Sequence, residues 1–207
     1  MINVCQKCGA YRADKIIDPG SSFAICPACQ HKHRFRQLPL LLVCGPSGAG
    51  KSTICQYLMG RTETVVPLDA DLLWQPEFNS PDDNYRSFYE TWLRLGKNIN
   101  QSGRPMLLFN AGAIPDNIEP CVERRYFGES HYLALVCDDD TLVERLRQRP
   151  AWRQSRDEAF IQTQLDFNRW FREHAGETEP AIRLVDTSHT TVEETVGLVK
   201  EWIEERA

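Results

Sequence analysis

The stretch that most constrains the fold runs from Leu40 to Thr53 and reads LLLVCGPSGAGKST. It opens with a continuous apolar run, as in a buried strand, and its residues from Lys51 onward begin a periodic segment, as at the start of a helix. Between the two lies a match to G-x-x-x-x-G-K-[ST], a pattern that binds phosphate when it joins a strand to a helix. The sequence therefore predicts a strand, a phosphate-binding loop and a helix in this order.

Each residue type in this loop suits the phosphates of a nucleotide. Its three glycines permit positive φ, so backbone N–H groups can approach a polyphosphate closely, and the following helix adds the positive end of its dipole. We expect Lys51 to reach the β- and γ-phosphates and Ser52 to ligate Mg²⁺. The predicted nucleotide-binding residues of the loop are Gly45, Pro46, Ser47, Gly48, Ala49, Gly50, Lys51, Ser52 and Thr53.

Composition limits the class of protein. The chain has 207 residues, 42% of them hydrophobic, which suffices for one α/β domain and a small appendage. No apolar run approaches the roughly 20 residues that span a bilayer, so no membrane association is expected. Cys5 and Cys8 stand where a secretion signal would need an apolar segment, which favours the cytoplasm. Thiols stay reduced there, so the eight cysteines indicate metal binding or packing before disulfides.

Two C-x-x-C pairs near the N-terminus, separated by 17 residues, have the spacing of a four-cysteine zinc site. The predicted ligands are Cys5, Cys8, Cys26 and Cys29. So short a segment buries little apolar surface, so the metal would supply folding stability, and four thiolates would make the site structural. A redox dithiol or two chance pairs are the alternatives. His31 and His33 either replace a ligand or are solvated residues of a basic segment.

Charge divides the chain into two parts. Residues 1–36 carry a net charge of +4 in a chain whose net charge is −5, so the remainder carries −9. An acidic main part argues against broad nucleic-acid binding there. The basic residues 31–36 either contact a nucleic acid or a substrate phosphate, or form a solvated surface. We place the domain boundary after residue 37, with a zinc ribbon over 1–37 and the main domain over 38–207.

Beyond this boundary, five short apolar segments alternate with helical patterns. The segments are Leu40–Cys44, Val65–Leu68, Met106–Phe109, His131–Cys137 and Ala181–Val185. Helices are expected over 52–60, 82–102, 118–127, 138–149 and 157–174, and from 191 onward. This alternation predicts an α/β fold with a parallel sheet covered on both faces. Ligands of such sheets bind at the carboxyl ends of the strands, where the loop, Asp69, Asp71 and Asn110 would meet.

Asp69 and Asp71 directly follow the second predicted strand. Alternate residues of extended chain share a face, so one carboxylate could hold Mg²⁺ through water while the other accepts a proton from a substrate hydroxyl. Asp71 is the predicted base and Asp69 its helper; an acidic turn that caps the next helix is the alternative. The third strand ends in Asn110 where ATPases and GTPases usually have an acidic residue, which argues against a hydrolysing motor or switch. Asn110 either faces a substrate or forms a strand-end turn.

Arginines crowd the segment around Pro150, where a predicted helix breaks. They are Arg145, Arg147, Arg149, Arg153 and Arg156. Such a segment can close over a triphosphate, exclude water and stabilise charge on the transferring phosphoryl group, although any single arginine can also be a solvated helix residue. Arg149 and Arg153, near the break, are the predicted catalytic arginines, and Arg145 is a predicted nucleotide ligand. Trp74 is the aromatic residue best placed to contact a planar substrate.

These residues together resemble the nucleoside and nucleoside-monophosphate kinase-like branch of P-loop proteins, which includes shikimate, gluconate and adenylylsulfate kinases. The resemblance covers roughly residues 39–206 and rests on Gly45–Ser52, Leu68–Asp71, Glu144–Pro150 and Val185–Ser188. It implies a three-layer P-loop NTPase sandwich with sheet order 2-3-1-4-5, a mobile lid over ATP and transfer of the γ-phosphoryl group. It places Asp69 and Asp71 at the acceptor, and Thr187 and Ser188 beside the adenine. The familiar members have no N-terminal zinc ribbon.

The sequence thus predicts an ATP- and Mg²⁺-dependent phosphotransferase with a Zn²⁺-binding ribbon at its head. The expected partner is a small-molecule acceptor with a hydroxyl or phosphate group, a nucleoside or nucleotide first; the oligomeric state is left open. One alternative is a kinase that acts on a nucleic-acid end, with the basic ribbon gripping the strand. The other is a regulatory protein that binds ATP without catalysis.

Overall fold

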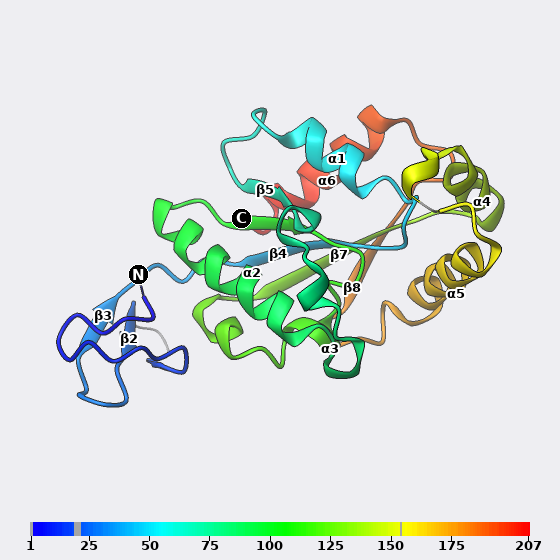
Figure 1. Ribbon diagram of the computed structural model, residues 1–207. Helices are drawn as coiled ribbons and strands as arrows, with labels where there is room; N and C mark the ends of the chain where they lie inside the picture. Colours follow the sequence, from blue (N-terminus) through cyan, green and yellow to red (C-terminus); the bar gives the residue numbers. More distant parts are fainter. Residues whose placement is uncertain (1, 19–21, 154) are drawn as a thin grey trace.

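The computed structural model describes residues 2–18, 22–153 and 155–207. A five-stranded sheet with the order β5-β6-β4-β7-β8 forms its centre, and every neighbouring pair of strands is parallel (Figure 1). Counted along the chain from β4, this order is 2-3-1-4-5. The expected α/β fold and its strand order are therefore confirmed.

The strands of this sheet coincide closely with the predicted apolar segments. They are β4 (Leu40–Cys44), β5 (Val66–Asp69), β6 (Met106–Phe109), β7 (Ser130–Val136) and β8 (Ile182–Asp186). Every residue of β4 and β6 is buried, which is why both strands are apolar throughout instead of alternating with polar residues. Because β4 lies between β6 and β7, the loop that follows it opens at the middle of the sheet.

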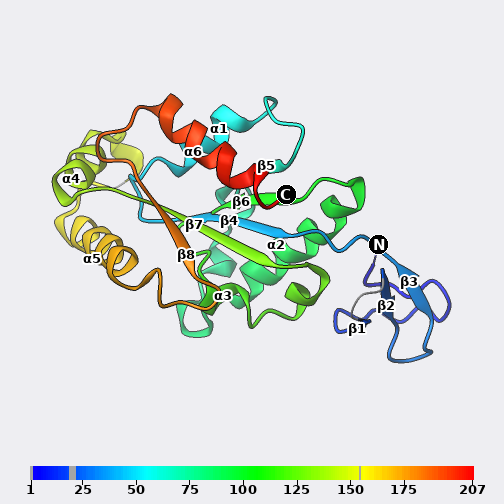
Figure 2. The ribbon, with the colours of Figure 1, turned by 180° about the vertical axis from the view of Figure 1, so that it is seen from behind.

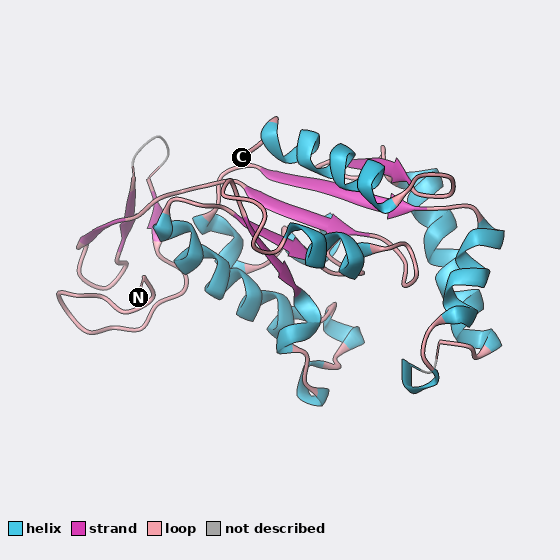
Figure 3. Ribbon diagram, turned by 90° about the horizontal axis from the view of Figure 1, so that it is seen from above, coloured by secondary structure: helices cyan, strands magenta, loops and turns pink. Residues whose placement is uncertain are grey.

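Helices cover both faces of the sheet. They are α1 (Lys51–Leu58), α2 (Arg86–Ile99), α3 (Pro115–Ile118), α4 (Asp139–Gln148), α5 (Glu158–His174) and α6 (Val192–Glu204). Leu41 and Val43 of β4 pack with α1 and α6, whereas Leu40 and Leu42 pack with α2 and α5. Alternate residues of one strand thus enter two separate cores, which gives the three-layer arrangement in Figure 3. Among the described residues, no helix has the length and apolar character that crossing a bilayer requires.

Short 3₁₀ helices replace parts of two predicted helices. They are η1 (Ala70–Leu73), η2 (Pro76–Phe78), η3 (Pro81–Asp83), η4 (Asn100–Ser102), η5 (Val122–Tyr126) and η6 (Ala151–Arg153). The expected helix over 118–127 is wrong: α3 ends at Ile118, and the chain resumes as η5. Pro120 explains the break, because it has no N–H to donate to the helix, and Cys121 after it is extended. The helix expected from 82 begins only at Arg86, because Asn84 and Tyr85 have positive φ.

A second, three-stranded antiparallel sheet precedes the main one (Figure 2). Its strands are β1 (Ile16–Ile17), β2 (Phe23–Ile25) and β3 (Lys32–Arg34). We call residues 2–36 the head and the remainder the body. The head lies beside the C-terminal end of α2, where the side chain of Gln101 bonds both the N–H and the carbonyl oxygen of Arg36 (2.8 and 3.2 Å). The predicted domain boundary after residue 37 falls in the connection to β4 and stays a prediction.

Candidate active site

The loop between β4 and α1 depends on a position that only glycine can occupy. Gly45 has a φ of 125°, and a Cβ atom there would lie 2.2 Å from the carbonyl oxygen of Leu135 in β7. Gly50, at a φ of 101°, directly precedes the first residue of α1. The backbone therefore turns tightly against the sheet and sends the N-terminus of α1 toward the open side of the loop.

Lys51 folds back over this loop. Its Nζ donates hydrogen bonds to the carbonyl oxygens of Gly45 (2.7 Å) and Pro46 (2.8 Å). Burial lowers the pKa of Lys51 to about 8, against the opposite influence of Cys44 and Asp71. Both acceptors of the ammonium are neutral, so a bound phosphate anion would stabilise its charge more strongly than the carbonyls do.

One cavity of about 540 Å³ lies over the loop, a volume in the usual range for small-molecule sites. Most of the predicted site residues line it: Ser47, Gly48, Ala49, Gly50, Lys51, Ser52, Thr53, Asp69, Asp71, Arg145, Arg149, Arg153 and Thr187. Gly45, Pro46 and Ser188 are not among its lining residues. The Ser188 hydroxyl instead accepts a hydrogen bond from the N–H of Asp138 (2.7 Å), where α4 begins.

The two predicted acidic residues differ in their contacts. Asp69 ends β5, and its carboxylate accepts a hydrogen bond from the N–H of Asp71 (3.1 Å), so it caps η1. The capping role considered as the alternative for this turn therefore applies to Asp69. Asp71 is largely exposed at the mouth of the cavity, with its Oδ2 3.8 Å from Nη1 of Arg153. Of the two, Asp71 has the carboxylate that is more accessible to a substrate.

The arginine-rich segment after α4 closes one side of the cavity. The helix ends before Pro150, and η6 carries Arg153 toward Asp71. Burial and the neighbouring Arg153 lower the pKa of Arg149, while Asp71 opposes them. A cavity wall with two adjacent guanidinium groups favours an anionic ligand, because each cation destabilises the other until an anion lies between them.

Arg145 is fixed by hydrogen bonds instead of pointing freely into the cavity. Its two terminal nitrogens donate to Oγ1 (2.9 Å) and to the carbonyl oxygen (2.7 Å) of Thr187. The Thr187 hydroxyl also contacts the carbonyl oxygens of Val136 (3.1 Å) and Ala49 (3.4 Å). Arg145 and Thr187 thus join α4, β8 and the phosphate-binding loop into one rigid wall.

Sequence reasoning missed several residues of the site. Gln164 of α5 accepts a hydrogen bond from the N–H of Ser47 (2.8 Å), and Trp152 of η6 lines the cavity although 72% of its surface is exposed. Thr190, Thr191, Val192 and Thr195 line it from the start of α6. The helix expected from residue 191 begins there, with Thr191 as its N-cap, but nothing in the sequence indicated that this helix start borders a cavity. Trp74 packs against Phe88 of α2 and is absent from the cavity lining.

Asn110 holds the turn after β6. Its Oδ1 accepts hydrogen bonds from the hydroxyl of Tyr89 (2.9 Å) and the N–H of Gly112 (3.0 Å). It also lines the cavity. Asn110 therefore forms the strand-end turn, and its contact with a substrate stays a prediction.

In the head, the sulfur atoms of Cys5, Cys8, Cys26 and Cys29 all lie within 4.8 Å of one another. The Cys5–Cys29 and Cys8–Cys26 sulfur distances are 3.6 and 3.9 Å. Four thiolates about 2.3 Å from a tetrahedral Zn²⁺ would stand about 3.8 Å apart. Burial disfavours ionisation of the Cys5 thiol, but hydrogen bonds from the backbone of Cys8 and Lys7 outweigh it and lower its pKa to about 5. The arrangement fits a four-thiolate metal site.

Two basic residues near these cysteines are buried. His33 is only 7% exposed, so its interpretation as a solvated residue is wrong. Lys15 is fully buried; burial lowers its pKa, and the four cysteines of the cluster oppose that effect. The remaining cysteines lie in the body, where burial raises the pKa of Cys44 and Cys55 to about 12. Such neutral thiols suit packing.

The central sheet, the phosphate-binding loop and the arginine-rich segment over one cavity define a P-loop kinase fold. A family model described as an AAA domain matches residues 41–162, more than half of the chain. The chain therefore belongs to this family of ATP-binding P-loop domains.

Solved structures support the same fold. A sugar kinase from Janibacter sp. HTCC2649 is similar with a TM-score of 0.59 and 16% identity, over 82% of this chain and 95% of that one. A gluconokinase from Sinorhizobium meliloti 1021 has a TM-score of 0.57 and 18% identity, over 82% and 94%. The tunicamycin resistance protein of Deinococcus radiodurans has a TM-score of 0.58 and 14% identity, over 81% and 96%. A search of curated protein sequences gave no match.

The close contact at Gly45 gives a first prediction. We expect Gly45→Ala to lower the free energy of unfolding by about 3 kcal/mol, because the added methyl group meets a backbone carbonyl and the φ is unfavourable. Gly60→Ala is the matched control: Gly60 also has a positive φ, but nothing lies within 4 Å of its Cβ position. That variant should lose only about 1 kcal/mol. Urea denaturation measures both, and equal losses would contradict the importance of the contact.

The pKa of Lys51 gives a second prediction. The ammonium binds phosphate in its charged form, and a bound anion raises its pKa, so affinity should fall as pH rises through the value of about 8 in the free protein. We expect affinity for Mg²⁺-ATP to drop roughly tenfold between pH 7.5 and 9. Calorimetric titration at several pH values measures this drop. Lys51→Arg stays charged and should give a flat profile, and a flat wild-type profile would exclude the proposed titration.

Proposed function

We propose that this protein is an ATP- and Mg²⁺-dependent phosphotransferase that moves the γ-phosphoryl group of ATP to a small-molecule acceptor. The observation that carries the proposal is that the phosphate-binding loop, Asp71 and two arginines border one cavity. A loop for the triphosphate, a carboxylate and mobile cations are the parts that phosphoryl transfer needs. A simple nucleotide-binding regulator would have no need of the carboxylate opposite the loop.

In the proposed reaction, the loop N–H groups and Lys51 hold the β- and γ-phosphates. The acceptor oxygen attacks the γ-phosphorus while its proton passes to the carboxylate of Asp71. The bond from the γ-phosphorus to the bridging oxygen breaks, and ADP leaves with that electron pair. Arg149 and Arg153 stabilise the charge on the transferring group. Because Arg153 lies 3.8 Å from Asp71 in the structure, ATP would draw it toward phosphate and free the carboxylate.

Residues with oxygen donors suited to Mg²⁺ line the cavity. The Ser52 hydroxyl lines it from α1, and Asp69 and Asp71 line it from β5 and η1. Mg²⁺ prefers such hard ligands and keeps several waters. Ser52 would hold it directly and Asp69 through water, and its charge would neutralise that of the β- and γ-phosphates.

The acceptor is proposed to carry a hydroxyl group. Nucleosides and nucleotides follow from the sequence resemblance, and two of the similar structures are a sugar kinase and a gluconokinase, so sugars and sugar acids are equal candidates. A nucleic-acid 5′ end is the remaining possibility, because the head is basic and the body acidic. All five classes belong in one acceptor panel.

We also propose that Cys5, Cys8, Cys26 and Cys29 hold Zn²⁺. Four thiolates leave no coordination position for a substrate, so the role is structural. The head has few apolar residues to bury, and metal binding would supply the folding energy that its core lacks.

A coupled assay of ADP release tests the proposed reaction. Wild-type protein with Mg²⁺-ATP should turn over with at least one acceptor of the panel, and Lys51→Ala should abolish turnover. Asp71→Asn should lower kcat by about 10³-fold, because it removes the base without changing the shape of the site. Asp140→Asn is the control, an exposed carboxylate in the first turn of α4.

The outcomes separate the alternatives. ADP release that rises with an acceptor and depends on Asp71 supports the proposed kinase. Full turnover by Asp71→Asn would exclude Asp71 as the base while leaving the kinase intact. Tight ATP binding with no acceptor-dependent ADP release across the panel would favour a regulatory ATP-binding protein.

A further inference from the structure

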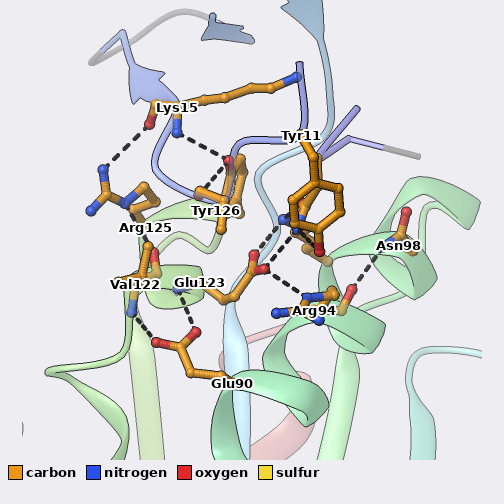
Figure 4. A network of polar contacts seen from close by, with 12 residues as sticks. Tyr11, Lys15, Glu90, Arg94, Asn98, Val122, Glu123, Arg125 and Tyr126 are labelled. Atoms are coloured by element: carbon orange, nitrogen blue, oxygen red, sulfur yellow. Dashed lines mark hydrogen bonds and ion pairs between the residues drawn. The ribbon is translucent and has the colours of Figure 1, made fainter. Parts of the chain in front are cut away.

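The head docks on the body through buried charges. Lys97 of α2 is fully buried, and its ammonium bonds Oδ1 of Asn3 in the head and Oε2 of Glu123 in η5. The other oxygen of Glu123 accepts hydrogen bonds from Nδ2 of Asn3 (2.9 Å) and Nε of Arg94 (3.0 Å). Figure 4 shows Glu123 at the centre of this network. Removal of either partner would leave a buried charge unpaired.

Tyr126 connects this network to the segment that carries Lys15. Its ring lies under the Lys97 ammonium, 3.7 Å from Nζ to the ring centroid. Its hydroxyl donates to the carbonyl oxygen of Ala13 (2.7 Å) and accepts from the N–H of Lys15 (3.3 Å). Arg125 contacts the carbonyl oxygen of Lys15 (3.5 Å), as Figure 4 also shows. The backbone at Lys15 is therefore held on the body from two sides.

The side chain of Lys15 carries a positive charge in the buried part of the head. It is fully buried, and within the described parts of the chain its Nζ has no hydrogen-bond partner. The nearby carboxylate of Asp14 is bound by Arg12 through two hydrogen bonds (2.5 and 2.7 Å). Burial lowers the pKa of Lys15, and the groups that oppose this effect are the four cysteines of the cluster. A buried ammonium needs an anion nearby, and the cluster is where one could form.

The charged groups at the interface between head and body also indicate that Lys15 needs an anion from the cluster. The fully buried charged groups there are the ammonium groups of Lys15 and Lys97 and the carboxylate of Glu123, and the half-exposed Arg94 adds a third cation. The carboxylate of Glu123 already pairs with Lys97 and Arg94, so it is not the counter-ion of Lys15. A divalent metal held by four thiolates carries a net charge of −2, which would supply the anion that the Lys15 ammonium needs.

We propose that the metal-bound four-thiolate centre is the counter-anion of Lys15, and that Lys15 couples metal binding to the docking of the head on α2 and η5. This inference rests on the metal site proposed above. Lys15 is a positioning residue: its ammonium stabilises the thiolates from outside the coordination shell, and its backbone bonds Tyr126 and Arg125. Metal loss would reduce the negative charge of the cluster, and the head would then detach from the Lys97–Glu123 network.

Metal release from the full-length protein tests the inference. Wild type, Lys15→Met and Lys32→Met are loaded with Zn²⁺, and release to a coloured chelator is followed. Lys32 is the matched control, because it is an exposed lysine of the same head. We expect Lys15→Met to bind metal at least about tenfold more weakly, as for other outer-shell partners, and Lys32→Met to match wild type. Lys15→Arg keeps the charge and should restore most of the affinity.

The Co²⁺-loaded variants report on the site itself. Lys15→Met should retain the absorption of a tetrahedral four-thiolate centre, which would show that the ligands are intact and only the affinity has changed. Wild-type affinity in a Co²⁺-loaded Lys15→Met protein would overturn the inference and leave the metal site standing. A wild-type protein that binds neither metal would overturn both.

A measurement on wild type alone covers the case in which Lys15→Met does not fold. Amide hydrogen exchange is recorded with the metal bound and after chelation. We expect chelation to speed exchange in η5 and in the C-terminal half of α2, where the head docks, and to leave the α1 and α6 face unchanged. Equal exchange in η5 with and without metal would contradict the coupling.

Discussion

The close approach of the chain to β7 at Gly45 is the contact on which the rest of the structure depends. β4 occupies the middle of the sheet, and the turn that follows it at Gly45 must fit against the Leu135 carbonyl before α1 can begin. This fit fixes where the loop N–H groups and Lys51 lie. The arginine-rich segment and the turn after β5 reach the same point, because all parallel strands end on one rim. The candidate site is thus a consequence of sheet order.

Helix α2 connects this site to the head. Near its start, Tyr89 bonds Asn110 at the cavity rim, and eight residues later Lys97 bonds the head through Asn3. Eight residues of helix span about 12 Å. A buried ion pair such as Lys97 with Glu123 adds little net stability, but it penalises every other placement of the head, because a misplaced head leaves a charge unpaired. The main effect of the network is therefore to fix one orientation of the head on the body, and its contribution to stability is small.

The fold and the chemistry of the loop could be predicted because both are local in sequence. An apolar run, a glycine-rich turn and a helix start identify the loop, and the cysteine spacing identifies the cluster that the structure brings together. The contact of Gln164 with Ser47 and the pairing of Lys97 with Glu123 join distant segments, so no spacing reveals them. The helix over 118–127 was a mistaken prediction because Pro120 stands within it and cannot donate a helical hydrogen bond. His33 was misjudged because its basic neighbours are exposed while it alone points inward.

The claim that the loop binds the β- and γ-phosphates of ATP is tested most directly by calorimetric titration with Mg²⁺-ATP and with AMP. One Mg²⁺-ATP should bind per chain, and AMP should bind about 100-fold more weakly, because it lacks the phosphates that make charge-assisted hydrogen bonds with Lys51 and the loop. Lys51→Ala should reduce the affinity for Mg²⁺-ATP toward that for AMP. Equal binding of the two nucleotides, or full Mg²⁺-ATP affinity in Lys51→Ala, would contradict the claim.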